Sequence, residues 1–342
     1  MREIVGDLCH SELLKKTKQI LAFDETKDYG TWKKEVQDKL YELLGMEEIE
    51  KNACPLQLTI EKDEKKDGYR QIRFVFESEQ GAFVPCYLLI PDTGKDKYPV
   101  VITLQGHSSG FHNSIAEPKN EKENEYALGR GKFAVQAVQR GYIALAIEQR
   151  AMGERKTDRH DFSPLMCSFP TLTAFLLGRT TIGERVWDVQ RAIDLLSEFP
   201  QADTDKIVLT GNSGGGTATY YTACMEERIK IAVPSCAFCS YETSILDIFH
   251  CPCNYIPSAY KWFEMQDLAC MIEPRNLAIV AGGEDGIFPI NGVRAGFETV
   301  QKIYNTAGAK ENCRLVVTEK GHWWCEDIVY NTIAEEAKKL GW

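Results

Sequence analysis

Short apolar runs alternate with helix-like segments from about residue 98 to the end of the chain. The runs span residues 100–104, 142–147, 207–210, 231–233, 277–281 and 314–318. Between them, apolar residues at helical spacing predict helices over about 125–139, 183–198, 214–226, 292–306 and 326–340. Continuous apolar runs are typical of parallel strands that helices cover on both faces. The pattern therefore predicts an α/β fold with a mostly parallel central sheet.

In the first hundred residues the apolar positions are spaced differently. Apolar residues repeat on one helical face over residues 31–44, where Gly45 is a typical stop, and a weaker helix is predicted over about 11–22. Residues 71–77 alternate apolar and polar side chains as a half-buried strand does, and a partner strand is predicted over 83–90. These two strands would form an antiparallel start to the sheet.

The same pattern divides the chain into parts. We expect an N-terminal helical extension over residues 1–50 that packs on an α/β domain over residues 51–342. Two stretches, at about 151–178 and 234–274, fit neither strand nor helix well. They are predicted to be insertions that cover a pocket above the strand ends.

Charge and composition narrow the class of partner. The net charge is −10, from 40 Lys and Arg against 50 Asp and Glu, which argues against nucleic acid or an anionic membrane as the main partner. The N-terminus lacks the basic and apolar runs of a secretory signal, and no apolar run is long enough to span a bilayer. We therefore expect a cytoplasmic protein whose twelve cysteines are reduced thiols.

The segment Gly211-Asn212-Ser213-Gly214-Gly215 lies between a predicted strand and a predicted helix. It matches G-x-S-x-G, a sharp turn that lifts a serine hydroxyl off the sheet. Glycine suits both ends of this turn, because a Cβ there would collide with the neighbouring strand or helix. Ser213 is the candidate nucleophile.

A serine hydroxyl needs a base to attack at neutral pH, and His322 follows the last predicted strand directly. Asp285 follows the strand before it, and the order Ser, Asp, His is that of α/β-hydrolases. Glu284 is the rival for the role of the acid. A lone histidine or a turn carboxylate also has a structural interpretation, but this order favours His322 as the base and Asp285 as the orienting acid.

The developing oxyanion needs hydrogen-bond donors. The strand over 100–104 runs into a glycine-rich loop, residues 105–110, in the position of the loop that donates one backbone N–H in these enzymes. The candidate donors are the backbone amides of His107 and Gly214. The alternative is an ordinary glycine-rich turn.

Several motifs resemble those of α/β-hydrolases of the acetyl xylan esterase and cephalosporin-C deacetylase type, from about residue 98 to the end. They are the serine turn and the segments 282–289, 321–322 and 148–154, and the helix around Trp32 fits the same group's extension. The resemblance implies an α/β-hydrolase fold that hydrolyses small acyl esters, typically acetyl, on sugars or related polyols, with no metal needed.

Two positions depart from the group. The well-known deacetylases carry glutamine after the serine, where this chain has Gly214, and Arg-Gly-Gln where it has Arg150-Ala151-Met152. The reaction tolerates the first change, because the oxyanion donor is a backbone amide. The identity of the substrate does not carry over.

Four further side chains are candidates for the substrate pocket. Three aromatic residues stand beside the base or in the second insertion and would pack against a sugar or an aromatic leaving group, or else form part of the core. Arg150 would reach the pocket or form a structural ion pair. The candidates are Arg150, Tyr255, Trp262 and Trp323.

A cysteine-rich stretch in the second insertion offers an alternative, a metal site. Thiolates and imidazole suit zinc, but the Cys251-x-Cys253 spacing is shorter than is usual for zinc ligands, and free cysteines are commonly buried. We therefore expect a buried thiol cluster and no cofactor. The residues of the alternative are Cys236, Cys239, His250, Cys251 and Cys253.

The sequence as a whole favours a serine carboxylester hydrolase that acts on a small-molecule ester, and it is compatible with a homo-oligomer. Two alternatives keep the same three residues: a serine peptidase of the prolyl-oligopeptidase type, and a thioesterase or lactone hydrolase. The peptidase usually carries a large gating domain, and about one hundred residues before the sheet is too short for one. From other classes, the chain would be a catalytically silent hydrolase fold used for binding, or a zinc-stabilised interaction module.

Overall fold

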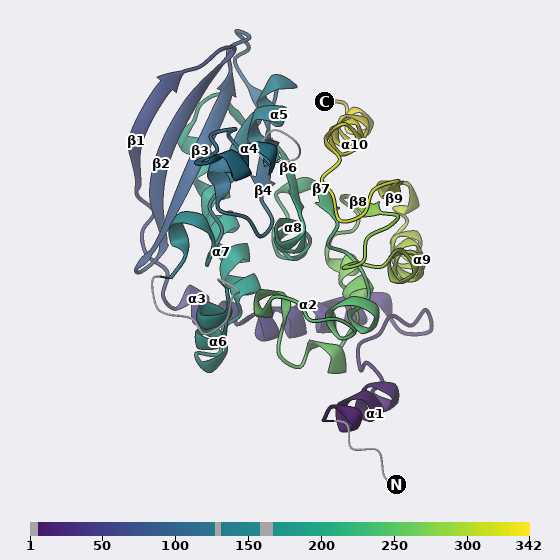
Figure 1. Cartoon of the computed structure of the whole chain (residues 1–342). Helices are drawn as coiled ribbons and strands as arrows, with labels where there is room; N and C mark the ends of the chain where they lie inside the picture. The colour runs from purple at the N-terminus through teal and green to yellow at the C-terminus, as the bar shows by residue number, and fades with distance from the viewer. Residues whose placement is uncertain (1–5, 127–130, 158–166) are drawn as a thin grey trace.

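The structure is a computed structural model that describes residues 6–126, 131–157 and 167–342. In this part of the chain one sheet runs in the order β1-β2-β3-β5-β4-β6-β7-β8-β9 (Figure 1). The first three strands and the β3–β5 pair are antiparallel, and all pairs from β5 to β9 are parallel. The strands are β1 Leu58–Lys65, β2 Tyr69–Glu79, β3 Ala82–Pro91, β4 Tyr98–Leu104, β5 Ile143–Ile147, β6 Ala202–Asn212, β7 Ile229–Ser235, β8 Asn276–Gly282 and β9 Cys313–Thr318.

The parallel strands follow from their apolar runs. Every residue of β5 and of β8 is buried, as expected for strands covered on both faces. The predicted α/β class with a mostly parallel sheet is therefore confirmed, and so is the antiparallel pair at its start. β1 was not predicted, because its sequence LTIEKDEK is mostly charged and lies exposed at the sheet edge.

Helices cover both faces of the sheet (Figure 1). On one face α5 and α10 pack with Val101, Ala278 and Val280, and on the other α2, α7, α8 and α9 join the larger core with Val100, Ile102 and Ile279. The helices are α1 Leu8–Lys16, α2 Tyr29–Leu44, α3 Met46–Glu50, α4 Glu121–Tyr126, α5 Phe133–Gln139, α6 Ser168–Leu176, α7 Thr181–Asp194, α8 Gly214–Met225, α9 Ile290–Thr306 and α10 Glu326–Lys339. None of the described helices is both long enough and apolar enough to cross a membrane.

The N-terminal extension is fixed to the core by α2. Its buried residues include Trp32 and Val36, and the Trp32 Nε1–H donates to the carbonyl oxygen of Leu21 at 2.9 Å. Gly45 ends the helix at a φ of 74°, a left-handed conformation that glycine adopts without strain. The weaker helix begins earlier than expected, at Leu8, and ends at Lys16 with no buried residue.

The two stretches proposed as insertions contain little regular structure. The first holds a short turn at Gly153–Arg155 and α6, and residues 158–166 within it lie outside the described part. The second forms short helical turns at Tyr241–Ile245, Pro252–Asn254, Ala259–Lys261 and Met265–Met271. The helix predicted over 125–139 is observed as α5, preceded by α4, and residues 127–130 between them are not described.

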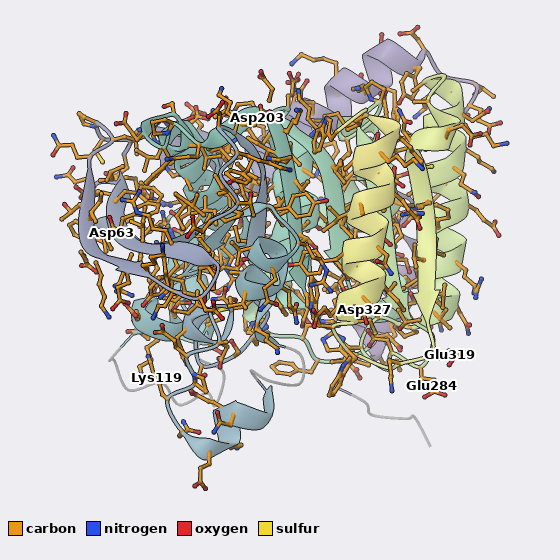
Figure 2. The ribbon with its side chains drawn as sticks, turned by 90° about the horizontal axis from the view of Figure 1, so that it is seen from above. Asp63, Lys119, Asp203, Glu284, Glu319 and Asp327 are labelled. Carbon is orange, nitrogen blue, oxygen red and sulfur yellow. The ribbon has the colours of Figure 1, made fainter. Side chains whose placement is uncertain are left out.

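The parallel topology places the loops that follow the strands at one end of the molecule. Figure 2 shows Glu284 and Glu319, in the loops after β8 and β9, at the opposite end from Asp203, which lies near the beginning of β6. Lys119, in the segment after β4, lies at the same end as the two glutamates (Figure 2). This is the end at which α/β sheets bind their ligands.

Candidate active site

Ser213 occupies the sharp turn between β6 and α8. Its φ and ψ are 56° and −125°, a conformation that non-glycine residues rarely adopt and that is held here by the surrounding contacts. The Ser213 N–H donates to the carbonyl oxygen of Ser235 at 2.9 Å. A Cβ on Gly215 would lie 2.0 Å from the carbonyl oxygen of Leu104, so only glycine permits this approach of helix and strand. The sequence and the packing together present the serine at the end of the sheet.

His322 and Asp285 meet in the loops after β9 and β8. The Nδ1–H of His322 donates to Asp285 Oδ2 at 2.9 Å, and Asp285 Oδ1 accepts the N–H groups of Ile287 at 2.8 Å and Phe288 at 3.1 Å. Burial alone would raise the pKa of Asp285, but the hydrogen bonds from His322 and the two amides outweigh it and hold that pKa below its ordinary value. The aspartate is therefore an anion at neutral pH, and its bond to the Nδ1–H places the acceptor lone pair of the neutral His322 ring on Nε2.

Glu284, the rival acid, is exposed beside this pair, whereas the Asp285 side chain is 1% exposed. The recorded acceptor of the His322 Nδ1–H is Asp285 Oδ2. The geometry therefore favours Asp285 over Glu284 as the partner of the imidazole.

Phe288 and His250 pack around the imidazole of His322. The Phe288 ring stacks on the His322 ring with centroids 6.0 Å apart, and it meets the His250 ring edge-on at 5.4 Å. Ser244 Oγ donates to the carbonyl oxygen of Ile287 at 2.7 Å, so it accepts the Nε2–H of His250 at 3.1 Å. Burial, followed by the nearby His322, lowers the pKa of His250, which keeps this second ring neutral.

The thiol of Cys236 lies next to the Asp285–His322 pair. Its Sγ lies within 4.8 Å of the ligand atoms of both Asp285 and His322 and donates to the carbonyl oxygen of Trp323 at 3.5 Å. Burial, and then the charge of Asp285, raises the pKa of Cys236 to about 11, so the thiol is neutral at physiological pH. Because the thiol carries no charge, it does not repel the Asp285 carboxylate, which stays paired with the imidazole of His322.

The loop after β4 packs closely against the turn that carries Ser213. A Cβ on Gly106 would lie 3.0 Å from Ser213 Cβ, and the next residue, His107, places its ring 2.9 Å from where a Cβ on Gly214 would stand. Gly214 is the first residue of α8, so its N–H is one of those that a helix leaves without an intrahelical partner. The two residues that carry the candidate oxyanion donors, His107 and Gly214, thus lie in the segments that pack around Ser213.

Glu148 anchors this loop, a role that the sequence analysis did not assign. Its carboxylate accepts the Gln105 Nε2–H at 2.7 Å, the Phe111 N–H at 3.3 Å and the Glu154 N–H at 3.2 Å. Burial raises the pKa of Glu148 to about 7, although these amides oppose the shift. The signal in the sequence was the position of Glu148, one residue after an apolar strand, among otherwise polar neighbours.

Comparison with known proteins now places the chain in a family. A model of the Abhydrolase family matches residues 4–322. The chain belongs to this family. The Bacillus subtilis protein named "Putative hydrolase YtaP" is 25% identical to it over 245 residues, which are 70% of this chain and 78% of that protein.

Two solved structures show how widely the fold of this Abhydrolase-family protein is shared. A putative acetyl xylan esterase from Bacteroides fragilis superimposes with a TM-score of 0.79 at 17% identity, over 98% of this chain and 95% of that one. A glucuronoyl esterase from Solibacter usitatus gives a TM-score of 0.67 at 15% identity, over 95% of this chain and 98% of that one. At these identities the likeness shows the α/β-hydrolase fold.

The four candidate pocket residues of this Abhydrolase-family protein have different surroundings. Trp323 adjoins His322 and is 41% exposed, which suits a ligand contact. Tyr255 donates its hydroxyl to the carbonyl oxygen of Ile245 at 3.1 Å and packs against the main core. Trp262 also packs on that core, and the ammonium of Lys39 in α2 lies 4.1 Å above its ring. The described contacts of Tyr255 and Trp262 are those of packing residues.

Arg150 forms a structural ion-pair network. Its guanidinium lies 3.0 Å from Asp188 and 3.6 Å from Glu184, and it also pairs with Glu79. These carboxylates hold the pKa of Arg150 above its ordinary value despite burial. Of the two interpretations that the sequence allowed for Arg150, these contacts favour the ion pair.

The cysteine set considered as an alternative metal site does not converge in the described part of the chain. Cys239 Sγ lies beside Thr243 Oγ1 at 3.2 Å, His250 bonds to Ser244, and Cys236 faces Asp285. The described contacts therefore do not bring these five residues together as one ligand set. Only Cys251 and Cys253 of the five lie together, because they share one short turn.

Proposed function

We propose that the protein is a serine carboxylester hydrolase that removes a small acyl group, such as acetyl, from a carbohydrate or another small hydroxylated compound. The observation that carries the proposal is the 2.9 Å hydrogen bond from His322 Nδ1 to Asp285, at the sheet end where Ser213 occupies its strained turn. A strained serine between strand and helix, followed along the chain by an aspartate and a histidine, is the arrangement of α/β-hydrolases.

The proposed reaction has two halves. His322 Nε2 takes the proton of Ser213 as Oγ attacks the ester carbonyl, and the amides of His107 and Gly214 donate to the oxyanion. The imidazolium then gives this proton to the departing alcohol, which leaves an acyl group on Ser213. Water, deprotonated by the same imidazole, attacks the acyl-enzyme and releases the carboxylic acid. Asp285 stays ionised throughout and stabilises the imidazolium.

The names of proteins with a similar fold support the substrate class. The two solved structures described above are named acetyl xylan esterase and glucuronoyl esterase. The exposed indole of Trp323 beside the base offers a flat face for a sugar ring. The small-molecule ester, the cytoplasmic location and any homo-oligomer remain predictions from the sequence.

The test is a series of initial rates. Aryl esters from acetyl to octanoyl, followed by acetylated sugars, should show a preference for the shortest acyl group. Ser213→Ala should lower kcat by more than about 10³-fold with every ester, since removing the nucleophile of such a triad costs at least this much. A preference for octanoyl esters, or turnover of Ser213→Ala within about tenfold of the parent, would contradict the proposal.

A further inference from the structure

We propose that His107, Cys167, Cys251 and Cys253 bind one zinc ion beside the serine turn. The four candidate ligand atoms, Nε2 of the histidine and three Sγ atoms, all lie within 4.8 Å of one another. They come from three separate segments of the chain: the loop after β4, the residue that precedes α6, and the short turn that begins with Cys251 as its N-cap. Segments this far apart in sequence rarely bring four such ligands together by chance.

The spacing of the ligands suits a tetrahedral ion. His107 Nε2 lies 3.2 Å from Cys253 Sγ, and Cys253 Sγ lies 3.4 Å from Cys251 Sγ. Zinc bonds of about 2.3 Å to sulfur and about 2.1 Å to nitrogen place tetrahedral ligands about 3.6–3.8 Å apart. Adjustments of a few tenths of an ångström therefore bring these two pairs to the separation that zinc requires.

The chemistry of the set selects zinc and a structural role. Three thiolates and one imidazole are soft to borderline ligands, which favour zinc over magnesium or calcium. A site of four protein ligands is closed and has no open position for a water nucleophile. The ion would therefore hold the fold together and take no part in the chemical step.

Arg185 gives independent support. It is 2% exposed, and its guanidinium lies 3.4 Å from Cys253 Sγ and 3.6 Å from Cys167 Sγ. The guanidinium also donates to the carbonyl oxygen of Arg150 at 3.0 Å, which is a neutral acceptor. Within the described residues no ion pair between Arg185 and a carboxylate is recorded, although a buried cation needs a countercharge. Three thiolates, one zinc ion and one guanidinium together carry no net charge. The zinc site therefore explains why an arginine is buried against sulfur.

The ion would fix the loop that carries one oxyanion donor. The ring of His107 lies against Gly214, and its backbone amide is the donor proposed above. Zinc at Nε2 would hold this ring, and the loop with it, at a fixed place beside Ser213. This consequence rests on the proposed esterase function. The zinc content is measured without any turnover assay, so a failed zinc proposal can be told apart from a failed esterase proposal.

The test measures bound metal in the full-length chain. Protein expressed with added zinc and purified under thiol reductant without chelator should contain about one zinc per chain by plasma mass spectrometry. Cys167→Ser and Cys253→Ser should each lower this to below about 0.1, because each removes one of four ligands. Cys9→Ser and Cys54→Ser are matched controls, since both thiols lie outside the cluster, and they should keep the full zinc content.

A second measurement covers variants that fail to fold. Cobalt(II) added to the reduced, metal-free parent protein should give the intense visible bands of tetrahedral cobalt and a thiolate-to-cobalt charge-transfer band. Zinc should then displace the cobalt and abolish these bands. Parent protein that holds less than about 0.1 zinc per chain and gives no such cobalt spectrum would overturn the proposal, as would equal zinc content in the cluster variants and the controls.

Discussion

The contact between Gly214 and the ring of His107 makes a sharp prediction about the residue after the nucleophile. A Cβ at position 214 would lie 2.9 Å from both Cε1 and Nδ1 of His107, closer than Cβ atoms ordinarily approach, whereas the next atom, Met152 Cε, lies at 3.5 Å. The methyl group of Gly214→Ala must therefore displace the ring. Glycine at this position leaves room for the ring of His107.

The size of the effect follows from that geometry. Overpacking a fixed site typically costs about 1–3 kcal/mol, so Gly214→Ala should lower the free energy of unfolding by this amount. Since the displaced loop also carries a proposed oxyanion donor, kcat/KM should fall by up to about 10²-fold. In a His107→Ala background the ring is gone, and the same methyl group should cost less than about 0.5 kcal/mol.

A double-mutant cycle measured by urea unfolding gives the coupling directly. We expect a coupling free energy of about 0.5–3 kcal/mol between positions 107 and 214. Gly30→Ala in α2 is the control, because the nearest atom to its added Cβ is at 3.8 Å, and it should be neutral or slightly stabilising. Equal costs of Gly214→Ala in the two backgrounds would refute this reasoning.

Three further predictions concern other residues of the site. Asp285→Asn should lower kcat on aryl acetates by about 10³–10⁴-fold with little change in KM, because the amide favours the wrong imidazole tautomer; a loss below tenfold would contradict this role. Since the folded-state pKa of Glu148 is raised to about 7, its contribution to stability is present below pH 4.5 and is lost as pH rises through 7. The free energy of unfolding of the parent relative to Glu148→Gln should therefore be about 3 kcal/mol more favourable at pH 4.5 than at pH 8, and an equal difference at both pH values would exclude the shift. Gly215→Ala should prevent soluble folding, because its Cβ would meet the backbone oxygen of Leu104 at 2.0 Å, whereas Gly286→Ala, with no atom within 4 Å, should fold; soluble, active Gly215→Ala protein would count against the turn described here.

The fold was predictable where burial dictates the sequence. The runs of β4, β5, β7 and β8 are apolar because both faces of these strands are buried, so a mostly parallel sheet could be predicted from the sequence. β1 could not, because an exposed edge strand has no apolar pattern to reveal it. The limits of α1 were misplaced for the same reason, since this helix buries no residue.

The part of the candidate site that lies directly after the parallel strands could be predicted from the sequence. Ser213, Asp285 and His322 each follow a parallel strand, and such strands end at the same edge of the sheet. The partners of Arg150 and of the cysteines were not predictable, because they depend on how irregular segments fold back. Cys167 and Cys253 are 86 residues apart in the sequence, and nothing local in either segment indicates that they meet.

The most direct test of the central claim is covalent trapping of the nucleophile. A fluorophosphonate probe should add once to the parent protein, and peptide mapping should place the adduct on Ser213. Ser197→Ala, a change on the exposed surface, should label as the parent does, and Ser213→Ala should not label. An adduct on another residue, or undiminished labelling of Ser213→Ala, would contradict the assignment of Ser213 as the nucleophile.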